Sequence, residues 1–178
     1  VEAGDSRAAD HLRHSIQAGQ IGSVLNQVDV EIVNELQRIA VQESRLGIPL
    51  LVGRDVIHGF KTVLPIPLGQ AATWNPDLVE ELNRITALEV AATGIDWTFA
   101  PCIAVPRDER WGRTYEGFGE TAEIQEIMAE ASVRGLQGND LLKPETIIAC
   151  AKHYVGDGGT NGGIDQGNTV ISEDELRA

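Results

Sequence analysis

The sequence predicts an α/β fold in which parallel strands form a sheet and helices connect them. Apolar runs of strand length alternate along the chain with segments of helical periodicity. These runs are continuous rather than interrupted by polar residues, which is typical of parallel strands covered on both faces. No low-complexity linker and no sequence repeat occurs in the 178 residues, so one domain is expected.

Four strands are predicted from the apolar runs, at residues 21–25, 48–52, 95–101 and 147–151. Pro49 lies at the start of the second run. A helical segment separates each strand from the next, as in βαβ units. We therefore expect the strands to pair in parallel through right-handed crossovers.

Three helices are predicted between these strands. The first ends at Gly47. The second begins with Asn75 as N-cap and Pro76 at the first helical position, and it closes at Gly94. The third ends near Gly138. The expected apolar positions are Ile32, Val33, Leu36, Ile39 and Ala40 in the first helix, Leu78, Leu82, Ile85, Leu88 and Ala92 in the second, and Ile124, Ile127, Met128, Ala131 and Gly135 in the third.

A further helix is predicted near the end of the sequence, where Ser172 and Glu175 have the spacing of a capping box. Only about one and a half helical turns follow before the sequence ends at Ala178. Four strand–helix units are half of an eight-unit barrel, and such barrels usually need about 250 residues. We therefore expect a partial (β/α)8 TIM barrel of about the first four strand–helix units. A complete small doubly wound domain is the alternative.

Charge and composition exclude several classes of partner. The formal net charge is −13 at pH 7, whereas nucleic acids and anionic membrane surfaces are bound through basic patches. No apolar run approaches the roughly 20 residues of a membrane span. The two cysteines, Cys102 and Cys150, fall in predicted strands and are expected to be free thiols. We expect neither nucleic acid nor membrane as a partner.

Polar side chains follow three of the predicted strands. Asp55 comes after the second strand, Arg113 lies in the segment after the third, and Lys152 and His153 follow the fourth. The carboxyl ends of parallel strands share one edge of a sheet, where barrels and open α/β sheets place their ligands. Asp55 is expected to accept hydrogen bonds and the three basic residues to donate them. This combination suits a sugar ring covered in hydroxyl groups.

Each of these residues also has a structural interpretation. Asp55 could pair with a nearby arginine, and Arg107 and Arg110 lie in the same segment as the candidate arginine. Lys152 is harder to explain in this way because a lysine is almost never buried unpaired. Trp111 is interpreted as core packing rather than as a platform for a sugar. The prediction therefore depends on the convergence of the three clusters.

Other site patterns fail in this sequence. Gly156 and Gly158 begin like a dinucleotide fingerprint, but Asn161 stands at the third glycine position and no helical pattern follows. Neither a Gly-Lys-Ser/Thr phosphate loop nor a Gly-x-Ser-x-Gly nucleophile turn occurs. His58 and His153 have no third ligand at zinc-like spacing. No metal and no cofactor is therefore expected.

The sequence around the strand ends resembles glycoside hydrolase family 3, which contains β-glucosidases and β-glucan exohydrolases. The segments LLVGRDVIHG (50–59), WGRTYEGFGE (111–120) and AKHYVGDGGT (151–160) are similar to signatures of that family, in the family's order and spacing. The segments LPIPLGQAATWNPDLVEE (64–81) and ALEVAATGIDWTFAP (87–101) match as well. The resemblance covers nearly the whole chain and is weakest in the first twenty residues.

The resemblance implies a role for each candidate residue. Asp55, Arg113, Lys152 and His153 align with the family's ligands for the hydroxyls of the sugar in subsite −1, and the Lys-His segment commonly carries non-prolyl cis peptides. The family hydrolyses glycosides with retention, using a nucleophilic aspartate on a later strand and an acid/base glutamate from a following domain. Neither catalytic carboxylate has a match in residues 1–178. The resemblance thus implies the N-terminal part of an exo-acting β-glucosidase, acting on β-glucosides or β-glucan oligosaccharides, that does not turn over substrate by itself.

The resemblance also bears on the branch of the family and on the compartment. Members that are β-N-acetylglucosaminidases typically continue the Lys-His segment as Pro-Gly-His-Gly, where this chain has Val155-Gly156-Asp157-Gly158. This disfavours that branch, while gluco- against xylo-specificity stays open. The residues after Val1 show no signal-peptide pattern and leave the compartment unknown. Family resemblance alone favours a periplasmic or secreted protein.

Two other functions stay open from the residues alone. One is a non-catalytic sugar-binding half-barrel that pairs with another copy or chain. The other is an unrelated α/β domain whose strand-end charges pair with each other. In either case the fourth strand of a half-barrel has an open edge, which predicts self-association.

Overall fold

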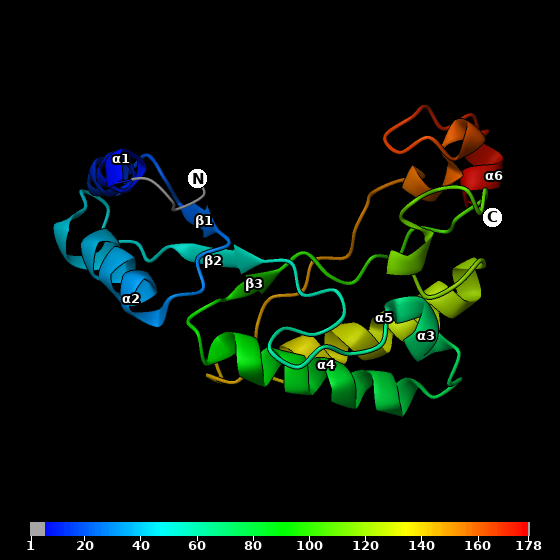
Figure 1. Cartoon of the computed structure of the whole chain (residues 1–178), viewed down its shortest axis with the longest axis horizontal. Helices are drawn as coiled ribbons and strands as arrows, with labels where there is room; N and C mark the ends of the chain where they lie inside the picture. Colours follow the sequence, from blue (N-terminus) through cyan, green and yellow to red (C-terminus); the bar gives the residue numbers. More distant parts are fainter. Residues whose placement is uncertain (1–5, 178) are drawn as a thin grey trace.

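The structure, a computed structural model, describes residues 6–177. Its centre is a parallel sheet in the order β1 (Ser23–Leu25), β2 (Leu51–Arg54) and β3 (Trp97–Thr98). The α-helices are α1 (Ser6–Gln17), α2 (Val30–Arg38), α3 (Pro67–Ala71), α4 (Pro76–Ala91), α5 (Ala122–Gln137) and α6 (Glu173–Arg177). Figure 1 shows an elongated molecule with α1 and α2 at one end and α3 and α6 at the other.

The predicted fourth strand lies parallel to β3, as expected, but pairs with it only at isolated bridges. One bridge joins Ile148 to Trp97, and the other joins Lys152 to Cys102. Between the bridges one segment runs from Trp97 to Cys102 and the other only from Ile148 to Lys152, so one extra residue interrupts the ladder. Four parallel segments are therefore present in the predicted order, and the last is less regular than predicted.

The second strand begins at Leu51, whereas its predicted start was residue 48. Pro49 has no N–H, and Leu50 gives both of its backbone groups to a side chain of α2. The Leu50 amide donates to Gln37 Oε1 at 2.9 Å, and Gln37 Nε2 donates to the Leu50 carbonyl at 2.8 Å. The pairing of β2 with β1 therefore starts at Leu51, directly after the residue that Gln37 binds.

The predicted start of α4 and the predicted end of α5 are confirmed. Asn75 caps α4 by accepting a hydrogen bond from the Leu78 amide, and Pro76 is the first helical residue. Thr121 caps α5 in the same way. Gly138 follows α5 with a φ of 56°, in the left-handed region that glycine adopts without strain.

The other helices agree less closely with the prediction. Asp29 caps α2, which passes into a π-helical turn at Ile39–Glu43 before it reaches Gly47. The capping box before α6 is present, since the Glu175 amide donates to Ser172 Oγ at 3.2 Å. Neither α1 nor α3 was predicted from the pattern of apolar residues. The three 3₁₀ turns are Thr114–Glu116, Asp157–Gly159 and Asn161–Gly163.

The predicted buried stripe of α4 is wrong. Leu78 and Leu88 are 36% and 39% exposed. The buried residues of this helix are Val79, Thr86, Ala87 and Val90. These residues are smaller than the leucines, and they face α5 and the sheet, where helices must approach closely. The large apolar side chains of α4 therefore lie beside the contact rather than in it.

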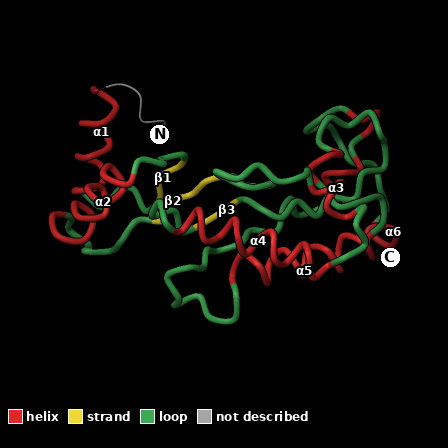
Figure 2. The backbone as a smooth tube through the Cα atoms, turned by 60° about the horizontal axis from the view of Figure 1, so that its bottom comes forward, coloured by secondary structure: helices red, strands yellow, loops and turns green. Residues whose placement is uncertain are grey.

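The helices α4 and α5 run side by side along one face of the sheet (Figure 1), and Figure 2 shows the same pair from a second direction. Gly135 allows this close approach, because a Cβ at this position would lie 2.3 Å from the carbonyl oxygen of Glu80. Ser132 Oγ donates to Asn83 Oδ1 at 3.0 Å across the same contact. The two helices pack beneath β3 and the fourth strand segment.

The two faces of the sheet have different surroundings. One face packs against α1, α2, α4 and α5 in a core made of Leu12, Ile16, Val24, Val33, Leu36, Ile39, Ala40, Leu50, Val52, Val56, Ala87, Val90, Ile95, Leu136 and Ile147. On the other face Leu25, Leu51 and Ile148 are 41%, 41% and 38% exposed. One face is therefore covered and the other is open. No helix within residues 6–177 is long and apolar enough to cross a membrane.

Candidate functional site

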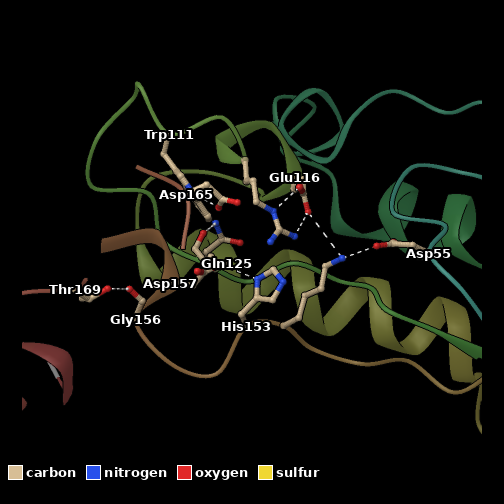
Figure 3. A network of polar contacts seen from close by, with 12 residues as sticks. Asp55, Trp111, Glu116, Gln125, His153, Gly156, Asp157, Asp165 and Thr169 are labelled. Atoms are coloured by element: carbon tan, nitrogen blue, oxygen red, sulfur yellow. Dashed lines mark hydrogen bonds and ion pairs between the residues drawn. The ribbon is translucent and has the colours of Figure 1, made fainter. Parts of the chain in front are cut away.

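The four predicted site residues come together where the strands end. Asp55 follows β2 directly, Arg113 precedes the 3₁₀ turn Thr114–Glu116, and Lys152 and His153 end the fourth strand segment. Figure 3 shows Asp55 and His153 on opposite sides of one polar network, with Glu116 above them. The predicted convergence of the three clusters is therefore seen in the structure.

Lys152 lies between two carboxylates. Its Nζ is 2.6 Å from Asp55 Oδ2 and 3.9 Å from Glu116 Oε2. The Lys152 side chain is 12% exposed, whereas that of Asp55 is 47% exposed. The ion pair joins residues 97 positions apart in sequence and fixes the end of the fourth strand segment against the end of β2.

Arg113 and Glu116 form a bidentate ion pair. Arg113 Nε donates to Glu116 Oε1 at 2.7 Å, and Nη2 donates to Oε2 at 2.9 Å. Burial alone would raise the pKa of Glu116, but the hydrogen bonds and charge of Arg113, with the charge of Lys152, outweigh burial and lower this pKa. The same hydrogen bonds raise the pKa of Arg113. Both groups are therefore charged at neutral pH.

Glu116 is a member of the site that the sequence analysis missed. The signal was an acidic residue three positions after a candidate arginine, inside the segment WGRTYEGFGE. Three residues is the spacing at which side chains meet on one side of a 3₁₀ turn. Glu116 is buried, and it connects Arg113 to Lys152.

His153 lies next to a second missed residue, Asp157. Burial and the charges of Arg113 and Lys152 lower the pKa of His153, against the opposing charges of Asp157 and Glu116. The imidazole is therefore neutral at neutral pH. The peptide bonds Lys152–His153 and Tyr154–Val155 are cis, as is Ala100–Pro101.

The competing structural interpretations have mixed outcomes. Asp55 does pair with a cation, but the cation is Lys152. Arg110 turns away from the site and binds Asp108, and its hydrogen bonds lower the pKa of Asp108 to about 2. Trp111 is 2% exposed, and its Nε1 donates to an aspartate at 2.9 Å, so its interpretation as core packing is confirmed.

Two hollows lie near the network. One of about 310 Å³ is lined by His153 and Asp157 together with residues of the 103–107 and 171–176 segments. A larger one of about 550 Å³, between α3 and the start of α5, is mostly apolar and has none of the four predicted residues in its lining. The smaller hollow has His153 of the four predicted residues in its lining, whereas Asp55, Arg113 and Lys152 line neither hollow.

The site offers hydrogen-bond donors and acceptors without a metal. Within residues 6–177 no group of three histidine, cysteine, aspartate or glutamate side chains is placed to hold a metal ion. Arg113 and Lys152 supply only donors, whereas Asp55, Glu116 and Asp157 supply only acceptors. Such an arrangement can bind a neutral ligand that carries many hydroxyl groups.

The fold is that of a barrel domain found in carbohydrate-active enzymes. A family model described as "Glycosyl hydrolase family 3 N terminal domain" matches residues 1–178. The chain belongs to glycosyl hydrolase family 3, which confirms the family predicted from the strand-end segments.

Curated relatives and solved structures cover nearly all of this chain. It is 35% identical over 176 residues to a periplasmic beta-glucosidase of Salmonella typhimurium, covering 99% of this chain and 23% of that protein. It is 31% identical to a beta-xylosidase of Formosa agariphila, covering 89% and 24%. The structure of a beta-glucosidase from Listeria innocua in complex with glucose has a TM-score of 0.87 at 33% identity, covering 97% and 24%.

These matches also confirm the predicted fold class, a partial (β/α)8 barrel. The chain spans about a quarter of the length of the curated relatives that it matches.

Proposed function

We propose that Asp55, Arg113, Lys152 and His153 bind the hydroxyl groups of the sugar in subsite −1 of a glycoside hydrolase. The whole protein would hydrolyse terminal, non-reducing β-D-glucosyl residues of β-glucosides or β-glucan oligosaccharides. The observation that carries the proposal is the network in which Lys152 contacts Asp55 and lies beside Glu116, which in turn holds Arg113. The family membership of the chain and the glucose complex of a similar enzyme support it.

In this proposal residues 1–178 are the N-terminal part of the barrel and supply binding rather than bond cleavage. Retention of configuration needs a nucleophile and an acid/base about 5 Å apart. The resemblance matches Asp55 to a sugar ligand of the family, so the proposal gives it no part in bond cleavage. Both catalytic carboxylates are therefore proposed to lie outside this segment, and the segment alone is proposed to be inactive.

Each ligand has a defined chemical task. Asp55 accepts hydrogen bonds from sugar hydroxyls, and its exposed carboxylate can reach a ligand without leaving Lys152. Lys152 and Arg113 donate to sugar oxygens. Glu116 keeps Arg113 in one orientation through two hydrogen bonds. The binding groups are therefore held in place before the sugar arrives, which lowers the entropic cost of binding.

The test uses the full-length protein and a nitrophenyl β-D-glucoside. Asp55→Asn and Arg113→Ala are each expected to lower kcat/KM by about 100-fold, because a lost hydrogen bond to a charged group costs up to about 3 kcal/mol. Arg110→Ala is the matched control, since this arginine points to Asp108 instead. Equal losses in Arg113→Ala and Arg110→Ala would contradict the proposal. Proton NMR of the first product should detect the β-anomer if configuration is retained.

A β-xylosidase is the second candidate, because one relative with that name is 31% identical to this chain. Comparison of nitrophenyl β-glucoside and β-xyloside turnover by the wild type decides between the two. A wild type that binds glucose in calorimetry but hydrolyses neither substrate would instead indicate a non-catalytic sugar-binding protein. A periplasmic or secreted location is proposed because two relatives are named as periplasmic enzymes; cell fractionation tests it.

A further inference from the structure

His153 and Asp157 have two atoms at hydrogen-bond distance that are not yet aligned as a hydrogen bond. His153 Nδ1 lies 2.9 Å from Asp157 Oδ2, and Figure 3 marks this contact. Both atoms are buried from solvent, and neither has a hydrogen-bond partner within the described part of the chain. A small rotation of the ring would align the pair, and the terminal torsion of histidine is soft. A buried polar atom without a hydrogen bond costs free energy, so a hydrogen bond between these two atoms is favoured.

The backbone holds Asp157 in this place. Gly156, with a φ of 85°, starts the turn that contains Asp157, and its carbonyl accepts a hydrogen bond from Thr169 Oγ1 at 2.7 Å. A Cβ on Gly158 would lie 2.3 Å from the carbonyl oxygen of Val105, so the turn packs directly on that segment. Contacts on both sides of Asp157 therefore fix its carboxylate beside the ring.

Burial and two neighbouring cations keep the imidazole neutral. Arg113 and Lys152 face the ring as cations, and Glu116 and Asp157 face it as anions. Burial and the two cations prevail and lower the pKa of His153. A neutral imidazole carries one proton, and a carboxylate can only accept. The proton therefore belongs on Nδ1, between the ring and Asp157.

We propose that Asp157 is a positioning residue that fixes His153 as the neutral tautomer protonated on Nδ1, so that Nε2 accepts a hydrogen bond from a hydroxyl of the bound sugar. This inference rests on the proposed function for the sugar, but the tautomer itself does not. Nε2 lies on the ring edge away from Asp157, on the side where Glu116 and Asp55 lie (Figure 3). His153 then acts as an acceptor, in contrast to the donor role expected from the sequence.

An acceptor at this position changes what the site recognises. A hydroxyl group can accept from Lys152 or Arg113 and at the same time donate to Nε2 of His153. Both hydrogen-bonding functions of one hydroxyl would then be used. A ligand group that can only accept would leave Nε2 unpaired, and such a loss disfavours binding.

The first experiment measures the tautomer directly in the full-length protein labelled with ¹⁵N-histidine. Long-range proton–nitrogen correlation spectra at pH 7.5 distinguish a protonated from an unprotonated ring nitrogen, and His153→Gln identifies the His153 signals by their loss. We expect Nδ1 to be protonated and Nε2 to be unprotonated. The reverse assignment, averaging of the two tautomers, or two protonated nitrogens would overturn the proposal.

The second experiment compares Asp157→Asn with Asp165→Asn. Asp165 lies in the same loop, but it accepts from Trp111 Nε1 and not from His153. Asp157→Asn should mix or reverse the His153 tautomer, lower the apparent pKa of His153 further and weaken competitive inhibition by glucose about 10-fold. Asp165→Asn should leave the tautomer unchanged. An Asp157→Asn protein with the wild-type tautomer and wild-type glucose inhibition would overturn the positioning role.

The two proposals fail in different ways. If the wild type has the expected tautomer but glucose neither inhibits it nor binds, the proposed function fails and the positioning role of Asp157 stands. If glucose binds but Nε2 is protonated, the positioning role fails and sugar binding stands. If Asp157→Asn does not fold, the wild-type spectrum still decides the tautomer.

Discussion

Lys152 and Arg113 at the strand ends are matched in number by the carboxylates of Asp55 and Glu116. Taking an ammonium out of water costs several kcal/mol unless it is paired, so the two carboxylates allow Lys152 to be 88% shielded. With two cations and two anions, this group of four has no net charge. It is therefore better suited to a neutral ligand with many hydroxyls than to a phosphate or another anion.

Protonation of His153 is expected to destabilise the protein in mild acid. The folded-state pKa of His153 lies below the ordinary value of 6.5, so below pH 6.5 the unfolded chain binds more protons at this residue. The contribution of neutral His153 is thus fully present above pH 6.5 and is lost as the pH falls from 6.5 towards the folded-state pKa. Burial is the largest cause of this lowered pKa; the charges of Arg113 and Lys152 add to it, and those of Asp157 and Glu116 oppose it.

Urea unfolding of the full-length wild type and of His153→Gln at pH 7.5 and 5.0 measures this effect. The free energy of unfolding of the wild type should fall more than that of the variant over this interval. The interval stays above 4.5, the ordinary pKa of Glu116, whose folded-state pKa is lower still, so protonation of that carboxylate does not contribute. An equal fall in the two proteins would show that His153 is not held neutral by the fold.

The boundary of a helix or strand could be predicted from the sequence where the residues that set it lie at that boundary. The helix α4 starts at Asn75 because the asparagine side chain caps its own helix, which the sequence alone reveals. The start of β2 depends instead on Gln37, which lies in another element and occupies the backbone of Leu50. The buried face of α4 likewise depends on α5. Contacts between elements are therefore where the predictions were shifted or wrong.

The site shows the same division. Asp55 and Lys152 could be predicted together because parallel strands end at one edge of the sheet, whatever their exact bounds. Glu116 had only its spacing from Arg113 as a signal, and Asp157 had none, because each is placed by a short 3₁₀ turn within a loop. The conformation of such turns follows from packing against other loops, as between Gly158 and Val105.

The turn Asp157–Gly159 gives a prediction at this scale. Gly158→Ala should displace the turn from Val105, because the new Cβ would meet backbone atoms that cannot move away easily. We expect a loss of about 1–3 kcal/mol in the free energy of unfolding, with weaker inhibition by glucose, since the turn carries Asp157. Gly22→Ala is the control, because a Cβ there meets nothing within 4 Å. Urea unfolding of both variants checks the difference, and similar stabilities would contradict the packing argument.

For the whole molecule, the decisive feature is the open face of the sheet. Leu25, Gly53, Trp97 and Ile148 lie in one row across the four parallel segments. Leu25 and Ile148 in this row, and Leu51 on the same face, are each about two-fifths exposed. Helices cover only the opposite face. In a closed (β/α)8 barrel this row would face the packed interior, where layers of side chains exclude water.

Residues 1–178 produced alone are therefore expected to self-associate. Two copies can cover their open faces and pair their free sheet edges, and burial of apolar surface gives about 25 cal/mol for each Å² removed from water. Leu51→Glu should weaken this association, because it places a charge on the face that the second copy must cover. Leu142→Glu is the matched control, since Leu142 is 94% exposed and lies in the loop after α5 rather than in a strand. Analytical ultracentrifugation over a range of concentrations measures the effect. A wild-type segment that stays a stable monomer, or equal weakening by both substitutions, would show that the open face is not what brings the copies together.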